Sequence, residues 1–106
     1  MGDRANVKFV NGNDAPMFFY THWSGTDLPT IVAKALKRGK DRWDDGSYLA
    51  RIIFSESIQD DVLELTGYGI STSVGDGDDR IITVRVDDQT VTDYEGNTKS
   101  FEEFGA

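Results

Sequence analysis

The only histidine of the chain stands in the stretch FFYTHWSGTD, residues 18–27, among aromatic, hydroxyl and carboxylate side chains. The segment that follows has helical spacing, and free backbone N–H groups at a helix N-terminus bind anions. His22, Trp23, Ser24 and Thr26 are therefore a candidate site for a phosphate or carboxylate ligand. The structural alternative is that Thr26 or Asp27 caps the helix, while His22 and Trp23 pack at the end of a strand.

Glu56 is the candidate for acid–base chemistry. Helical periodicity places it at the edge of an apolar face that includes Ile52 and Ile53. A carboxylate partly removed from water is a candidate general base, and together with His22 and a serine it would indicate a small hydrolase. Alternatively, an arginine, a tyrosine or water satisfies this carboxylate. The sequence has no nucleophile elbow, Walker loop, GxGxxG or HExxH motif, which weighs against an enzyme.

Metal and cofactor sites lack the residues that they need. The chain has no cysteine, which excludes disulfides and thiolate zinc sites. The aspartate-rich turn predicted over residues 75–79 does not match a calcium-binding EF-hand loop, because Arg80 stands where a ligand is required. We expect neither a metal nor a cofactor.

A second candidate surface is the segment RWDD. Arg42 and Trp43 belong to the residue types that dominate protein interfaces, and Asp44 and Asp45 follow them. These four residues predict a protein interaction site. Alternatively, Trp43 covers the corner between two helices.

The charge is acidic and uneven. Eleven basic and nineteen acidic residues give a net charge of −8, and residues 41–106 alone carry −11. A general nucleic-acid binder needs the opposite balance, so direct binding of nucleic acid is not expected. A protein partner with a basic surface suits this charge.

Hydrophobic periodicity predicts one α+β domain over residues 1–106, in the order ββααβββ, with a largely antiparallel sheet and two helices packed on one face. Strands are expected over 5–10, 17–23, 68–74, 81–86 and 90–94, and helices over 28–38 and from 44–45 to about 59. Residues 17–23 are apolar on both faces, as in the middle of a sheet. Alternate residues of 68–74 are small, so a helix, another backbone or a ligand should pack closely there. Ser100 and Glu103 predict a capping box.

No membrane partner is expected. The sequence lacks both an apolar run of about 20 residues and a signal-peptide core, which indicates a cytoplasmic protein.

Four blocks in order carry a family resemblance: MGDRAN, then YTHWSG with LP, then RWDD with YLARIIF, and finally TGYGISTS. Together they resemble a small protein family of bacteria and their phages, over roughly residues 1–86. The family has no established activity, so the resemblance implies a cytoplasmic, phage-borne protein and assigns no functional residue.

Three functions are consistent with these patterns. The first is a small acidic interaction protein that binds, and inhibits, a host or phage protein through an acidic and aromatic surface. Imitation of DNA charge would require carboxylates in rows on one face. The second is a binding protein for a nucleotide-like ligand at the turn after residues 17–23, and the third is the small hydrolase. The sequence leaves a homodimer open.

Overall fold

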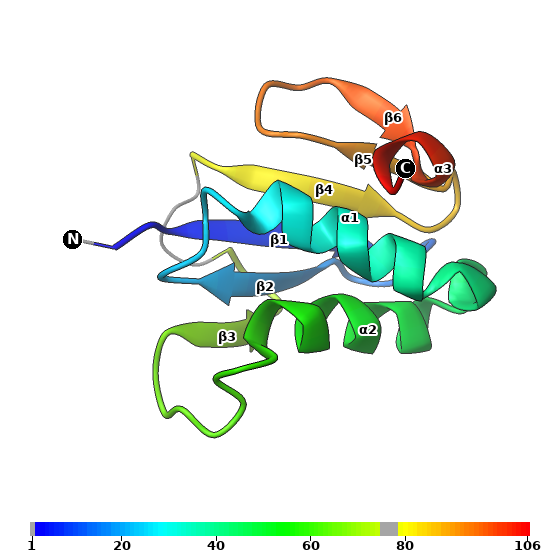
Figure 1. Ribbon diagram of the computed structural model, residues 1–106. Helices are drawn as coiled ribbons and strands as arrows, with labels where there is room; N and C mark the ends of the chain where they lie inside the picture. Colours follow the sequence, from blue (N-terminus) through cyan, green and yellow to red (C-terminus); the bar gives the residue numbers. More distant parts are fainter. Residues whose placement is uncertain (1, 75–78) are drawn as a thin grey trace.

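The computed structural model describes residues 2–74 and 79–106. Its elements follow in the order β1 (Ala5–Val10), β2 (Met17–Thr21), α1 (Leu28–Arg38), the 3₁₀ turn η1 (Lys40–Arg42), α2 (Gly46–Ile58), β3 (Tyr68–Ser71), β4 (Ile81–Arg85), β5 (Thr90–Thr92), β6 (Thr98–Ser100) and α3 (Phe101–Phe104). Figure 1 shows α1 and α2 together on one side of the sheet, as the sequence predicted.

The strands form one six-stranded sheet in the order β3-β2-β1-β4-β5-β6. The neighbours are antiparallel except for β1 and β4, which run parallel. The apolar strand β2 is therefore an interior strand, as its two apolar faces predicted. β3 and β6 form the two edges of this sheet.

The core lies between the helices and one face of the sheet. Alternate residues of β1, namely Ala5, Val7 and Phe9, point into it. The buried residues of α1 are Leu28, Val32, Ala35 and Leu36, a spacing that places them on one helix face. Each large aliphatic side chain buried in this way contributes about 1.5–3 kcal/mol, so packing alone can hold a fold without disulfides.

Among the described residues, side chains cap the N-termini of two of the three α-helices. Asp45 caps α2 by accepting a hydrogen bond from the backbone N–H of Tyr48, at 3.3 Å. Ser100 and Glu103 form the predicted capping box around α3. Asp27 stands at the N-cap position of α1, but its side chain makes no capping hydrogen bond.

Some boundaries differ from those expected. β2 ends at Thr21 because the Thr21 hydroxyl accepts a hydrogen bond from the backbone N–H of Ser24, which turns the chain out of the sheet. β3 ends at Ser71 and β5 at Thr92. The strand β6 was not predicted, because its sequence Thr-Lys-Ser has no apolar residue and so shows no alternation of apolar and polar residues. Of the turn predicted over 75–79, residues 75–78 lie outside the described residues.

The helices of residues 2–74 and 79–106 include none with the length and apolar character needed to cross a bilayer.

Candidate functional site

The carboxylate of Asp3 binds the segment just before α1. Asp3 accepts hydrogen bonds from the Thr26 backbone N–H at 2.9 Å and from its hydroxyl at 3.0 Å. Arg80 donates to the same carboxylate at 2.6 Å. These contacts, Arg80 first, lower the pKa of Asp3 from 3.8 to about 2. Thr26, one of the four residues predicted to bind a phosphate or carboxylate ligand, thus binds Asp3, and a ligand at this turn stays a prediction.

His22 lies just after β2 with its ring held on several sides. Its Nδ1 is 2.8 Å from the Tyr20 hydroxyl and accepts a hydrogen bond from Arg4 Nε at 3.3 Å. The Arg4 guanidinium can only donate, so Nδ1 is the acceptor in that contact. The Trp23 ring meets the His22 ring edge-on, with centroids 4.4 Å apart. His22 and Trp23 do come together, as the sequence predicted for either a site or a strand end.

Glu56 is brought to Arg38, on the neighbouring helix. Arg38 Nε lies 2.9 Å from Glu56 Oε1, and the Glu56 side chain is only 13% exposed. Gln59 donates to the other carboxylate oxygen at 3.1 Å. Of the alternatives considered for Glu56 from the sequence, the structure has the one in which an arginine pairs with its carboxylate. In the part of the chain that the structure describes, no hydrogen bond or ion pair joins Glu56 to His22.

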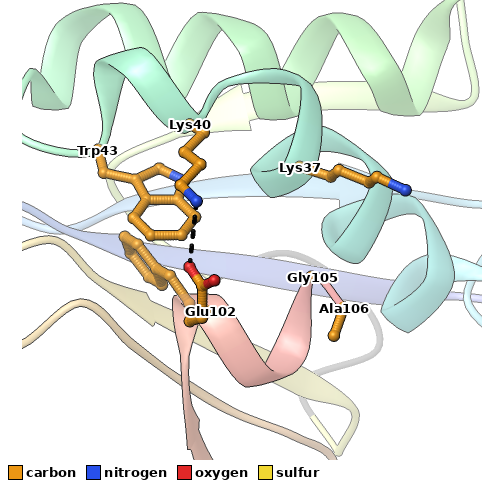
Figure 2. A pocket seen from close by; sticks show the side chains of 7 residues that line it. Lys37, Lys40, Trp43, Glu102, Gly105 and Ala106 are labelled. Carbon is orange, nitrogen blue, oxygen red and sulfur yellow. Dashed lines mark ion pairs between the residues drawn. The ribbon is translucent and has the colours of Figure 1, made fainter.

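Trp43 covers a corner of the fold. Its indole N–H donates to the Leu36 carbonyl at 2.9 Å, and its ring packs edge-on against Phe101, 5.5 Å between centroids. Figure 2 shows the pocket beside it, about 280 Å³, where Lys40 reaches Glu102 across 3.5 Å. Both contacts of the indole are internal, so Trp43 has a clear role in packing.

The other three residues of the RWDD segment also have internal partners. Arg42 lies over the Tyr48 ring, at 5.1 Å from its centroid. Asp44 accepts a hydrogen bond from Gln89 at 2.7 Å, and Asp45 caps α2. Asp44 is thereby tied to the turn between β4 and β5. Whether this segment also binds a partner stays a prediction.

The small-residue strand borders an open hollow. Gly69 and Ser71 lie on the face of the sheet opposite the helices, next to Phe18 and Tyr20. With Asn6 they line a depression of about 320 Å³. A methyl group added at Gly69 would meet only Tyr20, at 3.9 Å. The close packing predicted here is therefore not made by another element at Gly69.

Metal ligands do not converge in the described residues: no group of three or more histidine, aspartate or glutamate side chains could hold an ion there.

The most unusual surface lies along the free edge of β3, and sequence reasoning missed it. Of the seven large hydrophobic side chains exposed in residues 2–74 and 79–106, six belong to this region: Trp23, Val62, Leu63, Leu65, Ile70 and Val74. We call these six residues the β3-edge patch. Leu63 is 89% and Leu65 99% exposed, whereas leucine is usually buried. The available signal was three aliphatic residues in the acidic segment DDVLEL, outside any predicted element.

The loop that carries these leucines is ordered by its own contacts. Its backbone makes two turns, from Asp61 N–H to the Ile58 carbonyl at 2.7 Å and from Glu64 N–H to the Asp61 carbonyl at 3.0 Å. The Tyr68 hydroxyl donates to the Asp61 carboxylate at 2.6 Å. These hydrogen bonds hold the backbone that carries Leu63 and Leu65 in one conformation.

The protein is a single α+β domain. The sheet edge at β3 carries exposed apolar residues, with acidic residues next to them in the loop before β3. Comparisons with protein-family models, with curated proteins and with solved structures gave no match.

Proposed function

We propose that the chain is a protein-interaction module that binds its partner through the β3-edge patch. One observation carries this proposal: six of the seven exposed large hydrophobic side chains of the described residues lie along one edge of the sheet. Contiguous exposed apolar surface with a polar rim is typical of protein interfaces. Here three acidic residues, Asp60, Asp61 and Glu64, stand next to the apolar ones in the same loop.

Two further features support a protein rather than a nucleic acid as partner. The net charge of −8 repels phosphates. The loop of Leu63 and Leu65 is already held by backbone turns and by the bond from Tyr68 to Asp61, so little conformational entropy would be lost on binding. A phage origin and an inhibitory action, which the sequence suggested, are extensions of this proposal.

The test is site-specific photocrosslinking in the cells that make the protein. A benzophenone side chain replaces Leu65 in the patch or, as control, Glu95 at an exposed turn far from it in the sequence. We expect a protein adduct from position 65 that position 95 does not give. Substitution of Leu63 by Asp in the same chain should abolish this adduct, and Leu63→Met should retain it. Equal adducts from both positions, or none from position 65, would overturn the proposal.

A further inference from the structure

The helix side of the same edge carries a groove that complements the loop. Met17, Phe19, Ala50, Phe54 and Ile70 give it apolar walls around about 360 Å³. Ile70 pairs with Phe19 across β2 and β3 and so faces the helix side, yet it is 55% exposed. α2 therefore leaves the outermost strand partly uncovered. We call this hollow the α2 groove.

The groove has one charged residue in its lining, Arg51. Arg51 is exposed, and among residues 2–74 and 79–106 neither a hydrogen bond nor an ion pair engages its side chain. The loop carries the complementary chemistry, because exposed Asp60 precedes its two exposed leucines and exposed Glu64 stands between them. An acidic segment with exposed leucines thus complements an apolar groove that has a basic residue in its lining, in both hydrophobicity and charge.

The loop does not line the groove of its own chain, because none of the lining residues belongs to residues 59–67. The groove lies beside residues 47–54 in the first part of α2, whereas the loop leaves α2 after Ile58. At 1.5 Å per helical residue, the part of α2 that lines the groove, Ser47 to Phe54, ends roughly 6 Å before Ile58. Figure 1 shows the loop beyond the end of α2, extending past the sheet edge beside β3.

Loop and groove occupy opposite ends of one edge. Tyr68, at the loop end of β3, pairs with Thr21, whereas Ile70 lines the groove. A two-fold axis through the middle of this edge would bring the loop of each copy to the groove of the other. Two-fold symmetry is the commonest arrangement of protein oligomers, and it uses the same surface of both copies.

We propose that the partner is a second copy of this chain, in a two-fold dimer. Leu63 and Leu65 of each copy enter the α2 groove of the other, where Arg51 faces Asp60 and Glu64. A second copy is favoured over an unrelated protein because this chain supplies both complementary halves. The inference rests on the proposed function and names the partner of the same patch.

Charge reversal tests it with two variants. The first is Arg51→Glu, which makes the groove acidic. The second is Asp60→Lys with Glu64→Lys, which makes the loop basic and leaves the Asp61 bond to Tyr68 in place. None of the three substituted side chains lies in the core. Circular dichroism and thermal unfolding verify that both variants keep the fold.

We expect the wild-type chain to sediment as a dimer, and each variant alone to dimerise at least roughly tenfold more weakly, because like charges then meet. An equimolar mixture of the two variants should restore the dimer, and native mass spectrometry should find one copy of each chain in it. Only reciprocal exchange of loops and grooves predicts this rescue.

A monomeric wild-type chain, an unimpaired single variant, or a mixture that fails to pair would overturn the inference. The proposed function is judged separately by the crosslink at position 65. An adduct with a different protein, together with a monomeric chain, overturns the dimer and supports the interaction module. A monomer without any adduct overturns both.

Discussion

Asp3 and Arg80, 77 positions apart in the sequence, form a 2.6 Å ion pair. Arg80 also donates to the Arg4 carbonyl, at 2.7 Å from Nη2 and 3.1 Å from Nε. The pair therefore joins the residues that precede β1 to those that precede β4, beside the N-terminus of α1.

Acid should weaken this junction within a defined pH range. Arg80 and Thr26 lower the pKa of Asp3 from 3.8 to about 2 in the folded chain. The stabilisation is present above the unfolded value and is lost as the pH falls from about 4 to about 2. In the wild-type chain the free energy of unfolding should fall as the pH drops from about 4 to about 2. In Asp3→Asn this fall should be smaller, which urea unfolding at several pH values measures. Asp14→Asn, at an exposed turn, is the control, and an equal reduction in both variants would contradict the prediction.

Tyr94 should titrate at unusually high pH. Burial raises its pKa from 10.0 to about 12, and its hydroxyl donates to the Gly25 carbonyl at 2.6 Å. Because the folded value is the higher one, the stabilisation is complete below pH 10 and is lost as the pH rises toward 12. Absorbance at 295 nm should show a late tyrosinate step that Tyr94→Phe removes.

Tyr68 is the necessary comparison in this titration, because burial and the Asp61 carboxylate also raise its pKa. A step near pH 12 that persists in Tyr94→Phe but disappears in Tyr68→Phe would contradict the assignment to Tyr94. The lost hydrogen bond should cost Tyr94→Phe about 1 kcal/mol at neutral pH.

Glu56→Gln should reduce stability. The carboxylate is mostly buried against Arg38, whose own side chain is half exposed. This geometry lies between that of a surface pair and that of a buried one, so we expect a coupling of about 1–2 kcal/mol. A double-mutant cycle with Arg38→Gln, followed by urea unfolding, measures it. A coupling near zero would show that the two side chains act independently.

Gly67→Ala should disturb Trp23. Gly67 has φ +97, and an added Cβ would lie 2.5 Å from the indole nitrogen. Gly96 is a matched control, since its φ is +87 but nothing lies within 4 Å. Both substitutions strain the backbone by about 1–3 kcal/mol, but only Gly67→Ala adds a clash. We expect Gly67→Ala to be the more destabilising and the only one to change tryptophan fluorescence; equal effects would exclude the clash.

The regular elements were predictable because their signals are local. Asp44-Asp45, followed by residues with helical spacing, predicted α2, and alternation over residues 5–10 predicted β1 with its exact bounds. β6 has no such signal. It exists because Thr90–Thr92 offers an edge on which Thr98–Ser100 can pair.

The candidate site was harder to predict because its contacts are distant in sequence. No local pattern indicates that Asp3 would bind Thr26, 23 positions later in the chain. An exposed leucine cannot be distinguished by its type from a buried one. Leu63 and Leu65 become unusual only when the fold leaves them outside the core.

The parallel pairing of β1 with β4 has a consequence for synthesis on the ribosome. β1 can pair with β2 as soon as the first hairpin forms. The other edge of β1 has no partner until β4, residues 81–85, emerges after both long helices. Until then an inner strand of the finished sheet is an open edge, the kind of surface that recruits strands from other chains. The nascent protein is therefore most prone to aggregate just before β4 emerges.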